Sequence, residues 1–221
     1  MIKIPAIMKA APFLLALLFS LSGPLAAQDA KPTADEEKLK KLAGIVTWSK
    51  AQQAYDEGLK FFQQAKGDEA VAKFTEALTH IEKFTDARMA RGRTYYEMHR
   101  YEPALVDFTR VVAERPEEAN GHYQRGRTLW NLKRPEEALR AFDIAIQKQP
   151  RTYAYHESRA MLLESMKQQA RALADYDMMV ALQPLVPSNL ERRGRLLLEL
   201  GRKEEADEDE RQGCQLRDAG F

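Results

Sequence analysis

The sequence predicts an all-α protein built from repeated units, and three observations support this prediction. Helix-forming residues dominate, since Ala, Leu, Glu, Lys, Arg and Gln fill long stretches, and few runs alternate as strands do. An alanine recurs every 34 residues with similar neighbours around it. Prolines recur in three of the units at the same spacing, where they end helices and separate one unit from the next.

Composition excludes several classes of protein. The 221 residues, 44% hydrophobic and 30% charged, suffice for one domain or one short repeat array. A formal net charge of +1 provides no overall attraction for nucleic acid, so we expect no nucleic-acid partner. The single cysteine, Cys214, excludes an internal disulfide framework and a cysteine-based metal cluster. We expect no cofactor.

The first residues have the order of a secretory signal peptide. Lys3 and Lys9 precede an apolar run at 10–19, a helix-breaking Ser-Gly-Pro follows at 22–24, and small residues end at Ala27. The apolar run is shorter than the roughly 20 residues that a membrane span needs. We therefore predict that residues 1–27 are a signal peptide, that the mature chain is periplasmic or secreted, and that it has no stable membrane insertion. An uncleaved N-terminal anchor is the alternative.

Residues 28–50 are predicted to form a linker and an N-terminal capping helix. Residues 28–34 are mostly polar and contain Pro32, as flexible linkers do. From Asp35 to Trp48 the pattern is helical, and its apolar residues share one face. The end repeat of an array exposes an apolar surface, so we expect this helix to cover the first repeat. The apolar residues are Leu39, Leu42, Ile45 and Val46.

Five units tile the rest of the chain, from residue 51 to residue 220. Their bounds are 51–84, 85–118, 119–152, 153–186 and a degenerate last unit at 187–220. The recurring alanines are Ala70, Ala104, Ala138, Ala172 and Ala206. Small residues precede them at Gly58, Gly92, Gly126, Ala160 and Gly194. Aromatic residues follow at Phe74, Phe108, Phe142 and Tyr176, and prolines at Pro116, Pro150 and Pro184.

This pattern resembles the tetratricopeptide repeat (TPR) family, whose 34-residue repeat has small residues, an aromatic and a proline at these positions. The resemblance implies an α-solenoid, a right-handed superhelix of about five TPR helix pairs, here preceded by the signal peptide and a short N-terminal helix. The small residues allow the paired helices to approach closely, and the aromatic rings fill the space between units. The prolines end the second helix of each pair.

The resemblance also implies a groove lined by the first helices of successive units. We hypothesise that a peptide or protein partner lies along it, with Arg93 and Arg127 pairing with a carboxylate and with Tyr96 and Trp130 as apolar anchors. The predicted contact residues are Tyr55, Phe62, Met89, Arg93, Tyr96, Tyr123, Arg127, Trp130 and Arg195. Aromatics and arginine dominate interface energetics. The alternative is that these aromatics pack between helices and the arginines are solvated.

Other charged residues have structural explanations that we favour. Arginine recurs at position 7 of four units, and aspartate stands at position 23 of three of them, so we expect structural ion pairs rather than an anion-binding ladder. The arginines are Arg91, Arg125, Arg159 and Arg193, and the aspartates are Asp107, Asp175 and Asp209. The acidic run at 204–210 is interpreted as a polar cap on the last unit, with an acidic docking face as the alternative.

No constellation of residues predicts catalysis, and the chain is interpreted as a non-enzyme. A metal or enzymatic role through His122, His156 and Glu157 is the less favoured alternative. The predicted function is a protein–protein interaction scaffold of the bacterial cell envelope, with a self-associating structural component of an envelope or secretion complex as the second hypothesis.

Overall fold

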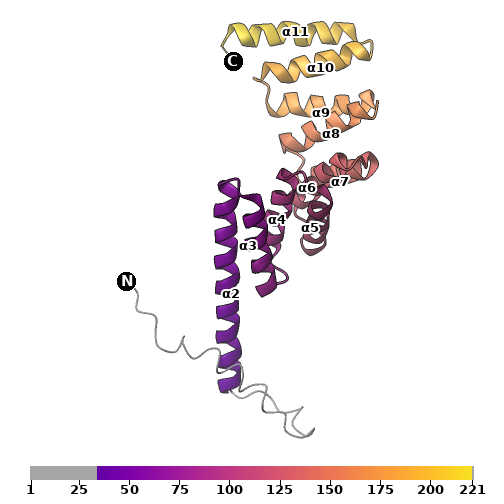
Figure 1. The fold of residues 1–221 in the computed structure, drawn as a ribbon. Coiled ribbons are helices and arrows are strands. Elements are labelled where there is room, and N and C mark those ends of the chain that lie inside the picture. The colour runs from indigo at the N-terminus through magenta and orange to yellow at the C-terminus, as the bar shows by residue number, and fades with distance from the viewer. Residues whose placement is uncertain (1–33, 221) are drawn as a thin grey trace. The chain divides into compact units, whose positions relative to one another are not determined.

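The structure, a computed structural model, describes residues 34–220. Within this range ten α-helices follow one another and no strand occurs, which confirms the all-α solenoid prediction (Figure 1). No helix in the described part of the chain is long and apolar enough to cross a membrane. The predicted signal peptide lies outside the described residues.

Each 34-residue unit from residue 51 onward contains one helix pair, and the pairs stack in chain order. The helices are α2 (Ala34–Gln63), α3 (Gly67–His80), α4 (Thr85–Glu97), α5 (Tyr101–Glu114), α6 (Ala119–Asn131), α7 (Pro135–Lys148), α8 (Tyr153–Ser165), α9 (Gln169–Leu182), α10 (Pro187–Glu199) and α11 (Lys203–Asp218). The second helix of one pair contacts the first helix of the next, as α5 does with α6 and α7 with α8. We number the pairs repeat 1 to repeat 5.

A glycine facing an aromatic ring holds the helices of the first three repeats together. A Cβ added to Gly126 would lie 2.7 Å from the ring of Phe142, closer than atoms in contact can approach. The same applies to Gly58 with Phe74 at 2.6 Å and to Gly92 with Phe108 at 2.8 Å. The structure seats each ring against the glycine of its own repeat. Phe142 also belongs to the buried cluster that includes Leu162 and Leu163 of repeat 4.

Two positions after the end of the first helix, every repeat has a residue with left-handed backbone. This residue is glycine only in the last repeat, where Gly201 has φ 75°. The others, Ala65, His99, Lys133 and Lys167, have φ between 57° and 60°. In repeat 3, for example, the backbone N–H of Arg134 donates to the carbonyl of Leu129 over 3.0 Å, as in Schellman helix ends. The turn geometry is therefore common to all repeats, although its usual glycine is not.

The first repeat begins inside a longer helix than the sequence predicts. A separate capping helix is expected near Asp35–Trp48, but α2 continues without interruption to Gln63, because no proline or turn sequence separates Trp48 from Ala51. Of the apolar residues expected on the covering face, Leu39 is 37%, Leu42 47% and Ile45 63% exposed, and Val46 is half-buried.

Candidate functional site

Residues at positions 9 and 12 of successive first helices meet in pairs. The guanidinium carbon of Arg93 lies 5.7 Å from the ring centroid of Phe62, and that of Arg127 lies 4.5 Å from the centroid of Tyr96. We call these four residues the arginine–aromatic row. The pairing arises because the first helices of neighbouring repeats, such as α4 and α6, are in contact. An arginine placed over an aromatic face is attracted by the ring's quadrupole.

The two arginines of the row make no ion pair with any carboxylate that the structure describes. The Arg93 side chain, which lies over the ring of Phe62, is exposed to solvent. Arg127 donates to Gln124 Oε1 over 3.3 Å, and its guanidinium also lies 5.7 Å from the ring centroid of Tyr123. The Tyr96 hydroxyl accepts a hydrogen bond of 2.9 Å from Asn131 Nδ2. The row is therefore held in place by neutral partners and keeps two positive charges available.

Tyr55 and Tyr123, which the sequence assigns to the groove, pack largely between helices. The ring of Tyr55 lies 5.2 Å from that of Phe84, and burial is the main cause that raises the pKa of its hydroxyl. The ring of Tyr123 lies 4.7 Å from that of Tyr155. Both side chains are half-buried, so they form the walls beside the row rather than freely projecting anchors.

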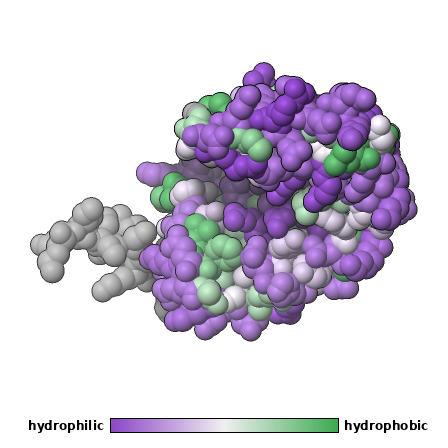
Figure 2. Space-filling model, turned by 90° about the horizontal axis from the view of Figure 1, so that it is seen from above, coloured by the Kyte–Doolittle hydropathy of each residue, from purple (hydrophilic) through white to green (hydrophobic). Residues whose placement is uncertain are grey.

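Met89 and Trp130 are half-buried as well, and Trp130 packs against the largest buried cluster. Two apolar side chains on later first helices are exposed, Met161 by 47% and Leu198 by 56%. Figure 2 shows that the visible surface is mostly hydrophilic, with small, separate hydrophobic patches. Met161 and Leu198 are thus exposed apolar side chains on the first helices of repeats 4 and 5.

The later repeats carry an acidic surface whose charges are already paired. Glu164 lies 3.7 Å from Arg195 and accepts a hydrogen bond of 2.9 Å from the Tyr176 hydroxyl. Glu157 pairs with Arg192 over 2.6 Å. Glu191 is likewise bonded to Arg217. Arg195, predicted as a contact residue, therefore differs from Arg93 and Arg127 because it has a carboxylate partner.

The position-7 arginines form the structural ion pairs that the sequence predicts in three of four repeats. Nitrogen–oxygen distances are 2.7 Å for Arg91–Asp107, 2.7 Å for Arg159–Asp175 and 2.6 Å for Arg193–Asp209. All three aspartates are buried. The fourth arginine, Arg125, has no such partner, because Ala141 occupies position 23 of its repeat.

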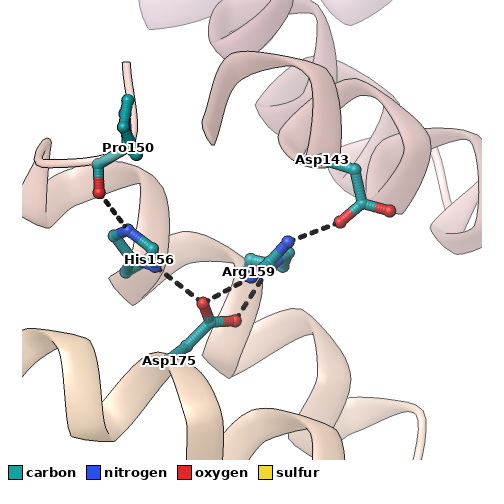
Figure 3. Close-up of polar contacts among 5 residues, drawn as sticks. All are labelled: Asp143, Pro150, His156, Arg159 and Asp175. Carbon is teal, nitrogen blue, oxygen red and sulfur yellow. Dashed lines mark hydrogen bonds and ion pairs between the residues drawn. The ribbon is translucent and has the colours of Figure 1, made fainter. Parts of the chain in front are cut away.

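In repeat 4 a histidine joins this ion pair, which sequence reasoning did not foresee. His156 Nδ1 lies 2.7 Å from Asp175 Oδ1, and its Nε2 donates to the carbonyl of Pro150 over 2.8 Å (Figure 3). Arg159 binds both oxygens of Asp175 and also reaches Asp143 over 2.7 Å. The hydrogen bond to Asp175 is the main cause that raises the pKa of His156, and the bond to Pro150 adds to it.

His122, the other histidine of the metal hypothesis, uses its Nε2 in a hydrogen bond to the carbonyl of Pro116 at 2.9 Å. Residues 34–220 contain no group of three or more histidine, cysteine or acidic side chains placed to hold a metal ion. Cys214 is exposed, and its sulfur lies 3.2 Å from an Arg217 nitrogen. In the acidic run of α11, Asp209 is the buried partner of Arg193 and Glu205 pairs with Arg202 over 2.6 Å.

Comparisons with known proteins agree with this architecture. The sequence profile of the tetratricopeptide repeat family matches residues 89–148 and 123–188. No curated protein matches the chain significantly. The crystal structure of MamA protein aligns with a TM-score of 0.71 and 16% identity, covering 76% of this chain and 92% of that one.

Two further solved structures show the same likeness. MamA residues 41 to the end, from Desulfovibrio magneticus RS-1, align with a TM-score of 0.69 and 16% identity over 77% of this chain and 97% of that one. YrrB, described as a TPR protein with an unusual peptide-binding site, aligns with a TM-score of 0.65 and 16% identity over 85% of this chain and 94% of that one. At these identities the likeness establishes a shared fold.

Proposed function

We propose that this chain, which belongs to the tetratricopeptide repeat family, is a non-catalytic scaffold that binds a peptide or protein partner along its first helices. The observation that carries the proposal is the arginine–aromatic row. Its two arginines are held on aromatic faces and have no carboxylate partner in the described chain. A preorganised guanidinium pairs strongly with a carboxylate, and arginine and aromatic residues are enriched among residues that dominate binding.

The charges of the two halves indicate the chemistry of the partner. Glu157, Glu164 and Glu191 on the first helices of repeats 4 and 5 each pair with an arginine of the same chain. They are therefore poor partners for a basic ligand. The row in repeats 1 to 3 has no such compensation. The partner we propose is therefore a segment with acidic side chains, together with an apolar residue that contacts Tyr96 and Trp130. YrrB, which shares the fold, is described as binding peptide, and this supports the use of such a surface.

Selection of random peptides displayed on phage against the purified chain tests this proposal. We expect the enriched peptides to contain Asp or Glu beside an apolar residue. The double variant Arg127→Ala/Trp130→Ala should weaken their binding tenfold or more, because each removed contact of this kind is worth about 1–2 kcal/mol or more. Arg110→Ala is the matched control, since Arg110 is exposed on the second helix α5.

Unchanged peptide binding by the double variant would reject the groove assignment. So would an equal loss with the Arg110→Ala control, because this would point to general charge attraction.

We also propose that the scaffold works in the bacterial cell envelope, after removal of residues 1–27. The support is the n-region, apolar run and small residues of the N-terminal sequence. Mass spectrometry of the protein from fractionated cells should find an N-terminus at Gln28 in the periplasmic fraction; an intact N-terminus in the cytoplasm would contradict export. Light scattering at high concentration distinguishes the scaffold from the second hypothesis, self-association, which predicts a dimer or larger species.

A further inference from the structure

Repeat 4 shows how a buried carboxylate is held between a histidine and an arginine. His156 at position 4 contacts one oxygen of Asp175 through Nδ1, over 2.7 Å. Arg159 at position 7 donates to the other oxygen through Nε over 2.8 Å. Arg91 and Arg193 use the same atom, since each donates from Nε to the position-23 aspartate of its repeat over 2.9 Å. The Nε–carboxylate bond is thus a regular feature of these repeats.

Repeat 3 has a histidine and an arginine at the same positions as repeat 4, but it lacks the carboxylate. His122 and Arg125 occupy positions 4 and 7, and Ala141 stands where Asp175 stands in repeat 4. His122 Nδ1 and Arg125 Nε are both buried, and neither has a hydrogen-bond partner. They are the two atom types that bind Asp175 in repeat 4. Three buried side-chain atoms without a partner are found in residues 34–220, and two of them are these.

The histidine ring is held in the orientation seen in repeat 4. Its Nε2 lies 2.9 Å from the carbonyl oxygen of Pro116, as Nε2 of His156 lies 2.8 Å from that of Pro150. His122 is only 5% exposed, and Ala141 only 2%. A carbonyl oxygen only accepts hydrogen bonds, so Nε2 carries a proton and Nδ1 is the atom left over. Leaving such buried polar atoms unpaired is costly.

No carboxylate of the described chain takes the missing place. The charge of Arg125 contributes to lowering the pKa of Glu137, but the hydrogen bond from Arg134 is the first cause and Arg125 the last. Glu137 is occupied by that bond, since Arg134 donates to both of its oxygens over 2.6 and 2.8 Å. The Arg125 side chain as a whole is half-buried.

We propose that repeat 3 binds one small carboxylate anion between His122 Nδ1 and Arg125 Nε, beside Ala141. A carboxylate group is what distinguishes aspartate from alanine, so formate supplies the atoms that Asp175 supplies in repeat 4. Because Nε2–H is bonded to Pro116, Nδ1 donates to the anion when the ring carries its second proton, as in the His156–Asp175 pair. This site is separate from the arginine–aromatic row and does not depend on the proposed function.

Nitrogen-15 NMR of the histidine rings, with the full chain titrated with sodium formate, tests the site. The chain has four histidines, so the His122 signals are assignable by substitution. We expect a saturable shift of the His122 ring nitrogens in the millimolar range, as befits a ligand of three heavy atoms. Sodium chloride at equal concentration is the control for ionic strength and should give no saturable shift.

Two variants separate specific binding from other effects. Ala141→Asp places a covalent carboxylate in the site and should abolish the formate response while raising the midpoint of urea unfolding. Ala113→Asp adds the same charge at an exposed position of α5 and should leave the formate response unchanged. A shift that never saturates, an equal response in Ala141→Asp, or saturation by chloride to the same extent would each overturn the proposal.

Discussion

Repeats 3 and 4 have helix pairs of the same lengths, but the hydrogen-bond partners of their buried polar atoms differ. Both consist of a 13-residue and a 14-residue helix, and both carry histidine at position 4 and arginine at position 7. Repeat 4 completes these residues with Asp175, whereas repeat 3 has Ala141. The helices nevertheless form with equal lengths and equal spacing. Apolar packing therefore specifies the repeat, and the polar network is an addition that one repeat has and its neighbour lacks.

The two repeats also differ in packing, because each combines a different small residue with a different aromatic residue. Repeat 3 combines Gly126 with Phe142, and repeat 4 combines Ala160 with Tyr176. All four residues are buried. The Tyr176 hydroxyl finds a partner in Glu164 on the first helix of its own repeat. Each repeat is thus packed as a matched pair of small and aromatic residues, and the pairs are not interchangeable one residue at a time.

The largest effect is expected from Asp175→Ala, which turns the network of repeat 4 into that of repeat 3. It leaves His156 and Arg159 without their shared carboxylate, and removing one partner of a buried pair costs about 3–5 kcal/mol. Urea unfolding followed by circular dichroism measures the loss. Asp143→Ala is the control, because Asp143 also binds Arg159 but is 42% exposed, and it should cost less than about 1 kcal/mol. Equal losses for the two variants would show that the buried network adds nothing specific.

A smaller effect is expected from Gly126→Ala, which gives repeat 3 the small residue of repeat 4 without the rest of its packing. The added Cβ would lie 2.7 Å from the Phe142 ring, so the helices must separate, at a cost of about 1–3 kcal/mol. Gly194→Ala is the matched control at the same position of repeat 5. Its Cβ would meet Asp209 Cβ at 3.4 Å, an ordinary contact, so thermal unfolding should show no loss. A neutral Gly126→Ala would contradict the glycine–aromatic explanation.

The smallest effect is a dependence on pH that belongs to repeat 4. Because the folded protein raises the pKa of His156 above its ordinary value of 6.5, the protonated ring stabilises the fold. This contribution is fully present below pH 6.5 and is lost as pH rises through the raised pKa. The stability difference between the wild type and His156→Gln should therefore be largest in acid and shrink toward alkaline pH. If the stability difference between the wild type and His156→Gln grew as pH rises, its sign would be the opposite of the one expected. This result would contradict an imidazolium–carboxylate pair between His156 and Asp175.

Local sequence spacing was sufficient for contacts within one repeat. Arg91 and Asp107 are 16 residues apart on paired helices, so the 34-residue pattern alone predicts that they meet, and they do. The same holds for Arg159–Asp175 and Arg193–Asp209. The His156–Asp175 contact could have been predicted in the same way, since His156 lies one helical turn before Arg159, but the sequence analysis considered His156 only as a metal ligand or catalytic residue.

Taken alone, the sequence determined the helical class, the length of the repeat and the residues that face inward, because these follow from spacing along a helix and from where glycine, alanine and proline recur. Tertiary structure decided which side chains of different repeats meet. The stacking of Arg127 on Tyr96 joins residues 31 positions apart and depends on how one helix pair rotates against the next. It also decided that His122 Nδ1 and Arg125 Nε are buried without a hydrogen-bond partner, since burial is a property of the packed array.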